Sequence, residues 1–211
     1  MIGFLKPAKF VTPLPESQID PSYRRYRLQL FLTAYLGYMA YYFVRSTLAL
    51  AKPYFLKDGF TMAQVGYLGS ALAVTYGLSK FIMGNVSDRS NPRYFLALGL
   101  FLSALVNLLV PGTLSFSGLF LLMLMNGWVQ GMGWPPCGRI MTHWFSDSER
   151  GTKMSIWNTA HNVGAGLLPL IVAIGVWAFG SWSGLFYLPA ICAIVFSILI
   201  LIFGRDVPQS V

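Results

Sequence analysis

The sequence has few charged residues for its length. Only 10% of the 211 residues are charged, against about 25% in an ordinary soluble domain. Hydrophobic residues make up 55% of the chain, and the mean hydropathy is +0.60. A water-soluble globule of this size has too little polar surface to cover so many apolar side chains. Soluble, disordered and secreted disulfide-rich classes are therefore excluded, and the sequence predicts an integral membrane protein.

Residues that form disulfides or hold metals are also scarce. Both cysteines, Cys137 and Cys192, lie inside apolar runs, so we expect neither a disulfide framework nor a zinc site. His143 and His161 have no spacing that suits a metal. The net charge of +8 could indicate nucleic-acid binding, but most basic residues lie between apolar runs, as membrane topology places them. We therefore expect no metal, no cofactor and no nucleic-acid partner.

The sequence does contain six apolar runs of about the length that crosses a bilayer. They cover residues 28–50, 62–86, 93–110, 116–137, 154–179 and 185–203. We expect an all-α membrane protein with six transmembrane helices in a bundle over 28–203. A cytoplasmic segment (1–27) precedes it, proline-rich and expected to be irregular before Tyr23, and a short cytoplasmic tail (204–211) follows it. The N-terminal segment lacks the features of a cleaved signal.

Basic residues predict the orientation of this bundle. Eleven of them fall on one side of the predicted membrane, namely Lys6, Lys9, Arg24, Arg25, Arg27, Arg89, Arg93, Arg139, Arg150, Lys153 and Arg205. The other side holds only Lys52 and Lys57. By the positive-inside rule, both termini are expected on the cytoplasmic face of the inner (plasma) membrane.

Two basic residues, Arg45 and Lys80, lie within predicted spans, whereas all seven acidic residues lie outside them. A charge in the hydrocarbon core costs at least about 2.5–3.5 kcal/mol, so it needs a partner or water. Two cations without an intramembrane carboxylate predict a site for an anion. An enzyme is disfavoured, because hydrolysis or group transfer would need a carboxylate pair, a Cys/His dyad or a metal cluster.

Hydrogen-bond donors surround both cations at helical spacing. Tyr38, Tyr41 and Tyr42 precede Arg45 by seven, four and three residues, and Tyr76 precedes Lys80 by four. The fifth span adds polar side chains at Trp157, Asn158, His161 and Asn162. Such donors suit phosphate oxygens, and arginine can hold two of them at once. Alternatives stay open: Tyr41 and His161 could be packing residues, and Lys80 could extend to the membrane surface.

Glycine and proline residues indicate architecture rather than chemistry. Gly127, Gly131 and Gly133 lie in the fourth span, and Gly164 and Gly166 in the fifth, at spacings that allow close helix contact or bending. The run WPPC at residues 134–137 is expected to unwind or kink the end of the fourth span.

Residues 84–93, GNVSDRSNPR, resemble the loop between the second and third spans of the major facilitator superfamily. The pattern is a glycine, an acid and two spaced basic residues. We expect Asp88 to cap a helix end and to pair with basic residues, which would hold one conformation closed. Asp88, Arg89 and Arg93 are therefore candidate gating residues.

Longer motifs resemble the organophosphate:phosphate antiporters, nearest to the glycerol-3-phosphate transporters. They are residues 20–25 (DPSYRR), 41–45 (YYFVR), 80–84 (KFIMG), 126–139 (NGWVQGMGWPPCGR) and 157–164 (WNTAHNVG). The resemblance implies that Arg45 grips the phosphate, that Lys80 and His161 assist, and that Tyr38, Tyr42 and Tyr76 line the cavity. It also implies exchange of glycerol 3-phosphate, or another organic phosphate, for inorganic phosphate.

The family has twelve spans in two halves, and this chain matches only the first half. We therefore expect half of a carrier, surrounded by membrane lipid, that needs a second six-helix half as a separate chain or a second copy. Two alternatives are an inactive truncated half-transporter and a membrane sensor of sugar phosphate.

Overall fold

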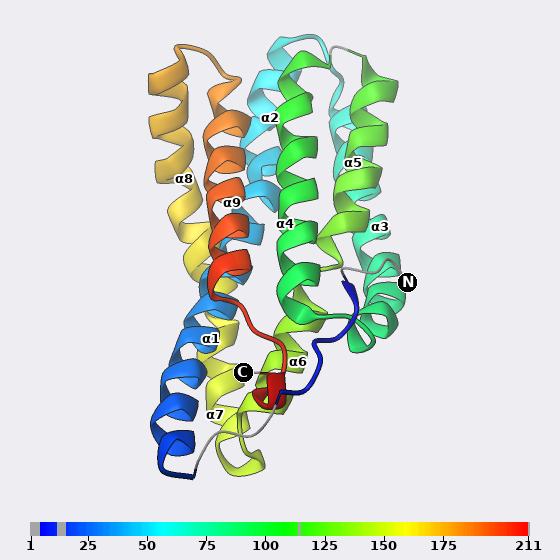
Figure 1. The fold of residues 1–211 in the computed structure, drawn as a ribbon. Coiled ribbons are helices and arrows are strands. Elements are labelled where there is room, and N and C mark those ends of the chain that lie inside the picture. Colours follow the sequence, from blue (N-terminus) through cyan, green and yellow to red (C-terminus); the bar gives the residue numbers. More distant parts are fainter. Residues whose placement is uncertain (1–4, 12–15, 114, 211) are drawn as a thin grey trace.

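The computed structural model describes residues 5–11, 16–113 and 115–210, which fold into helices without β-strands. The elements are α1 (Glu16–Arg45), α2 (Thr47–Lys57), α3 (Met62–Asp88), α4 (Pro92–Leu109), η2 (Val110–Gly112), α5 (Phe116–Gln130), α6 (Trp134–Trp144), α7 (Asp147–Asn158), α8 (Ala160–Phe179), α9 (Gly184–Phe203) and η3 (Pro208–Ser210). Helices α8, α9, α4 and α5 stand side by side across the molecule (Figure 1), and α3 packs along α5. The prediction of an all-α chain is confirmed.

Local sequence explains where several helices begin and end. Thr61 and Gln64 form a reciprocal capping box at the start of α3, and Asn91 caps α4, which has Pro92 in its first turn. Helix α8 ends at Phe179 and is capped by Gly180, whose φ of +63° is one that other residues rarely adopt.

Three of the predicted spans are interrupted. The expected interruption of the fourth span occurs, but at residues 131–133 and not within the WPPC run. Helix α5 ends at Gln130, and the run begins α6, where prolines in the first turn cost little because an N–H there lacks a helical partner. The first predicted span breaks at Ser46 and the fifth at Thr159, where neither glycine nor proline gives a local signal.

Length and apolar composition mark three described segments as able to cross a membrane: Pro92–Gly112, Asp147–Phe179 and Gly184–Phe203. Helix α5, with 15 residues, is too short by itself, because the break after Gln130 divides its predicted span. The count of six spans therefore stays a prediction.

The expected irregular structure before Tyr23 is wrong for residues 16–22, which belong to α1. Pro21 lies in the second turn, where it removes a single backbone hydrogen bond. Contacts offset this loss, since Tyr23 stacks on Trp144 at 5.9 Å and donates a 2.9 Å hydrogen bond to its carbonyl oxygen. Pro13 and Pro15 lie outside the described residues.

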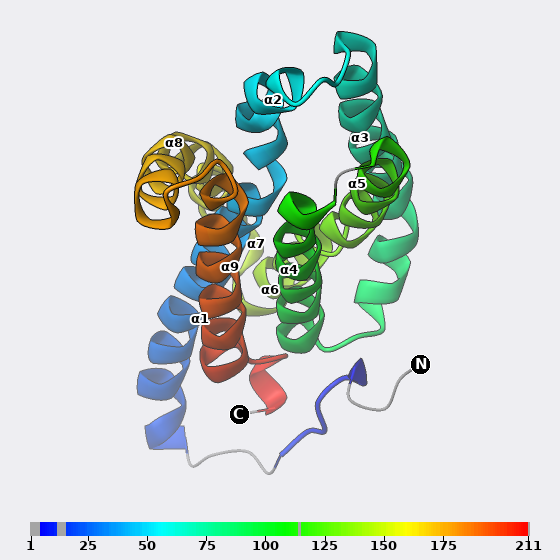
Figure 2. The same cartoon turned by 90° about the horizontal axis from the view of Figure 1, so that it is seen from above.

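Two apolar clusters form most of the core. One joins α1, α4, α6, α8 and α9, and the other joins α2, α3, α5 and α9. Figure 2 shows the arrangement of these helices from above. Gly127 and Gly131 bring α5 against α3, and Gly164 brings α8 against the backbone of α1, as small residues at these positions predicted. Gly166 has open space around its Cα and makes no such contact.

Candidate functional site

Arg45 and Lys80 converge on the ring of Tyr76. The guanidinium carbon of Arg45 lies 3.7 Å from the ring centroid, and the Lys80 Nζ lies 4.5 Å from it. Such distances allow cation–π attraction, which is stronger away from water. Tyr76 and Lys80 share one face of α3, whereas Arg45 belongs to α1, so the helix packing brings the two cations together.

Arg45 is the last residue of α1 and is half-buried. Among the described residues, no carboxylate lies within ion-pair distance of Arg45. The guanidinium therefore keeps its capacity for an anionic ligand.

Buried amides hold the end of α1 in place. The carbonyl oxygen of Val44 accepts hydrogen bonds from the Nδ2 of Asn107 at 2.9 Å and from the Nδ2 of Asn126 at 3.2 Å. Ser103 donates to Asn126, and Gln130 donates to Ser103 at 2.7 Å. Because these residues satisfy carbonyl groups that the helix end leaves free, they position Arg45. Sequence reasoning missed this network; its one signal was amide residues inside apolar runs.

An aromatic wall extends from Arg45 along α1 to α8. Arg45 lies 5.3 Å from the ring of Tyr42, which contacts Tyr38 at 5.7 Å and the imidazole of His161 at 5.5 Å. Tyr38 in turn packs on Trp157, with ring centroids 4.6 Å apart. The structure therefore brings Tyr38, Tyr42, Tyr76, Lys80, Arg45 and His161 into one chain of contacts.

Tyr41 has a different environment, although it is next to Tyr42 in sequence. Its side chain is buried, and its hydroxyl donates a 2.9 Å hydrogen bond to the carbonyl oxygen of Leu96. The packing alternative therefore describes Tyr41, which does not line the site.

A cavity of about 1180 Å³ opens beside Lys80. It extends along α3 to Asp88 and is closed on the other side by α6 and the start of α7, including Trp134, Arg139 and His143. Lys80 is exposed in this cavity, so its ammonium can meet a ligand that enters from that end. Asn158 and Asn162 are also exposed.

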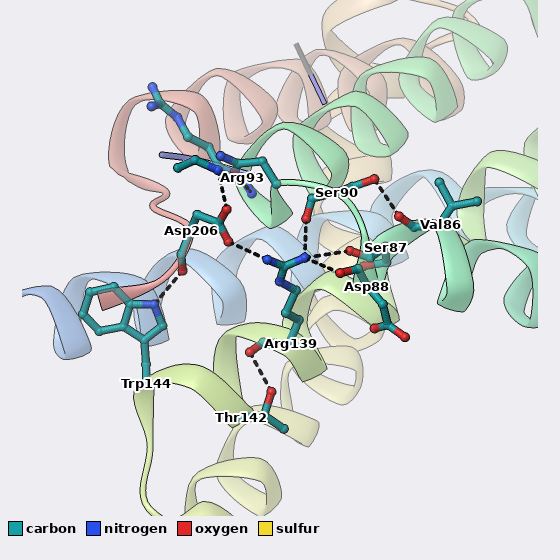
Figure 3. Close-up of polar contacts among 11 residues, drawn as sticks. Val86, Ser87, Asp88, Ser90, Arg93, Arg139, Thr142, Trp144 and Asp206 are labelled. Atoms are coloured by element: carbon teal, nitrogen blue, oxygen red, sulfur yellow. Dashed lines mark hydrogen bonds and ion pairs between the residues drawn. The ribbon is translucent and has the colours of Figure 1, made fainter. Parts of the chain in front are cut away.

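A second polar cluster centres on Arg139 at the far end of the bundle (Figure 3). One terminal nitrogen of its guanidinium donates to the carbonyl oxygens of residues 87, 88 and 90, at 3.2, 2.7 and 2.7 Å. The other pairs with the buried carboxylate of Asp206 at 3.0 Å. Asp206 also accepts from the backbone N–H of Ala8 at 2.8 Å, and its carbonyl oxygen accepts from the Trp144 indole at 2.7 Å.

The candidate gating residues lie around this cluster. The carboxylate of Asp88 is exposed, and it takes part in none of the ion pairs found in the described part of the chain. Asn91, and not Asp88, caps α4. Arg89 is exposed just after α3, and Arg93 donates through its guanidinium to the carbonyl oxygen of Leu201. The buried ion pair here is formed by Arg139 and Asp206, which sequence reasoning did not select.

The described side chains do not form a metal-binding site. The described ranges contain no group of three or more His, Cys, Asp or Glu residues able to hold a metal ion. The donors around Arg45 are cationic, phenolic and imidazole groups, a set that suits an anion with several oxygens.

The sequence matches a known protein family and several of its members. The family model described as Major Facilitator Superfamily matches residues 34–211. Over its whole length the chain is 52% identical to the glycerol-3-phosphate transporter of Bacillus subtilis (strain 168) and 38% identical to the membrane sensor protein UhpC of Escherichia coli (strain K12). It covers 48% of each relative, so the chain spans about half the length of the curated relatives it matches.

A solved structure shares the fold. It is a bacterial homolog of the human lysosomal transporter Spinster in an inward-facing, unoccupied conformation, with a TM-score of 0.73 and 20% sequence identity. The likeness covers 87% of this chain and 44% of that one. The family and its transporter relatives are membrane carriers and not enzymes, which confirms the expected class. The chain belongs to the major facilitator superfamily.

Proposed function

We propose that this chain is one half of a carrier that exchanges glycerol 3-phosphate for inorganic phosphate across the inner membrane. The observation that carries the proposal is the pair of cations, Arg45 and Lys80, on one tyrosine ring without a carboxylate partner in the described residues. The 52% identity to a glycerol-3-phosphate transporter supports this substrate. The proposed arrangement has six spans, both termini in the cytoplasm, and a second six-helix half across the cavity.

The site's chemistry gives each residue a role. A phosphate ester carries about −1.5 to −2 charge at neutral pH, which Arg45 can meet with two parallel hydrogen bonds and Lys80 with a point charge. Tyr38, Tyr42, Tyr76 and His161 add donors around the remaining oxygens. Binding neutralises the repulsion between the cations, so it favours closure of the two halves around the ligand.

The test is counterflow in proteoliposomes loaded with phosphate, with labelled glycerol 3-phosphate outside. Two proteins are measured: the chain alone, and the chain fused to the C-terminal half of the Bacillus subtilis relative. We expect the fusion to take up label only when internal phosphate is present. Arg45→Lys keeps the charge but loses one of two charge-assisted hydrogen bonds, each of which is worth about 1.5–3 kcal/mol, so uptake falls about 10- to 150-fold.

Arg25→Lys is the matched control, because Arg25 is exposed on the same helix and lies outside the site. It should leave uptake unchanged. Equal uptake by the Arg45→Lys fusion and its parent would refute the role of Arg45. A folded fusion without any uptake would refute exchange and favour the inactive half-transporter.

A membrane sensor is the second candidate, favoured by the 38% identity to UhpC over the whole chain. A sensor needs the same anion site but no counterflow. Sugar-phosphate binding that depends on Arg45, in an assembly that never exchanges phosphate, would support the sensor over the carrier.

A further inference from the structure

A small basic pocket lies between the first half of α1 and the middle of α7, away from the site at Arg45. Its volume is about 280 Å³. Three cationic and three apolar side chains line it: Arg24, Arg27, Lys153, Leu28, Phe31 and Phe145. This mixture suits a ligand with an anionic head and an apolar tail.

The pocket has more positive than negative charge. Arg27 pairs with Glu149 and lies 4.9 Å from the ring of Phe145. Arg24 and Lys153 take part in none of the ion pairs among the described residues, and the Lys153 Nζ lies 5.8 Å from the ring of Phe31. One carboxylate therefore faces three cations, which leaves two positive charges for an anion.

The pocket lies at the expected depth of lipid headgroups. Arg27 immediately precedes the first apolar run (28–50), and Lys153 immediately precedes the fifth (154–179). On the proposed orientation this is the cytoplasmic boundary of the hydrocarbon, where anionic lipids present their phosphates and basic pockets attract them.

An apolar track leads from the pocket along α1. Leu28, Leu32 and Leu36 repeat every four residues and are 63%, 47% and 38% exposed. Leu32 and Leu36 also line an apolar groove of about 240 Å³ between α1 and α9. Gly37 forms part of that groove, and a side chain there would collide with Ile200.

We propose that this pocket binds the phosphate of an anionic phospholipid, with one acyl chain along Leu28, Leu32 and Leu36. Arg24 and Lys153 meet the phosphate, and Phe31 and Phe145 pack against the glycerol region. This proposal depends on the proposed orientation of the bundle. It does not depend on Arg45, so its test does not decide whether the chain exchanges phosphate.

Thermal stabilisation of the full chain in neutral detergent tests the site. The probes are dioctanoyl phosphatidylglycerol, dioctanoyl phosphatidylcholine and inorganic phosphate, each titrated against the melting temperature. We expect saturable stabilisation by phosphatidylglycerol that depends on Arg24 and Lys153, and none by phosphatidylcholine. Any stabilisation by inorganic phosphate should not depend on these two residues, because its proposed site is at Arg45. The double variant Arg24→Gln/Lys153→Gln should need about 30-fold more of this lipid, because each basic residue near an anionic surface contributes about 1 kcal/mol.

The matched control is Lys52→Gln/Lys57→Gln, which removes the same charge from exposed positions on α2. It should bind phosphatidylglycerol as the unmodified chain does. Equal weakening in both double variants would show nonspecific attraction and overturn the proposal, as would equal stabilisation by phosphatidylcholine. Stabilisation by inorganic phosphate with the same dependence on Arg24 and Lys153 would identify a free-anion site instead. If the double variant does not fold, Lys153→Glu alone provides the same test.

Discussion

Replacing Asp206 with asparagine removes a charge from the cluster that joins both ends of the chain to the helix bundle. The carboxylate is fully buried, and the side chain of its partner Arg139 is only 10% exposed. Asparagine keeps the size of the side chain but only one of its two acceptor oxygens, so the change removes the charge and one of the hydrogen bonds that Asp206 accepts from Arg139 and the Ala8 N–H.

The expected loss follows from these contacts. Removing one partner of a buried ion pair costs about 3–5 kcal/mol when the other charge is left without compensation. Arg139 keeps three carbonyl acceptors, and hydrogen bonds to a charged group are worth about 1.5–3 kcal/mol each. We therefore expect Asp206→Asn to lower the free energy of unfolding by about 2–3 kcal/mol.

Reversible unfolding in mixed detergent micelles, followed by circular dichroism, measures this loss. Asp88→Asn is the matched control, since the Asp88 carboxylate is exposed and forms none of the ion pairs in the described ranges. The control should stay within about 0.5 kcal/mol of the unmodified chain. Equal losses in the two variants would refute the argument that burial and pairing make Asp206 the important acid.

Two further predictions concern packing and pH. Gly164→Ala should destabilise the chain by about 1–3 kcal/mol in the same unfolding assay, because a Cβ would meet the backbone of α1, whereas Gly166→Ala, with open space, should be neutral or stabilising. Hydrogen bonding to Arg27 lowers the pKa of Glu149 below its ordinary 4.5. A lowered pKa in the folded state stabilises it above pH 4.5, so the difference in stability between the chain and Glu149→Gln should shrink as the pH falls below that value. A difference that grew on acidification would contradict this sign.

The sequence alone selected the candidate residues of the site but not the contacts between them. Arg45 and Lys80 were selected because a cation in an apolar run is costly without a partner or water, and Tyr76 because it lies one helical turn from Lys80. The contact of Arg45 with Tyr76 joins two helices, however, and spacing along one helix cannot reveal which faces meet.

Tertiary contacts explain what the sequence did not predict. The pairing of Arg139 with Asp206 joins residues 67 positions apart, so no local pattern marks it. The helix breaks at Ser46 and Thr159 contain neither glycine nor proline. At Ser46, side-chain amides from other helices donate hydrogen bonds to the Val44 carbonyl oxygen just before the break. The loop pattern around Asp88 drew attention to the exposed acid, although a buried one lies nearby.

The amides that hold the Val44 carbonyl have a mechanical consequence. Asn107 and Asn126 belong to α4 and α5, so the end of α1 is fixed to two other helices within this half. Bending of α1 would break both hydrogen bonds in a buried place where no water replaces them. In the proposed carrier, the backbone that bears Arg45 therefore moves together with α4 and α5 as one body.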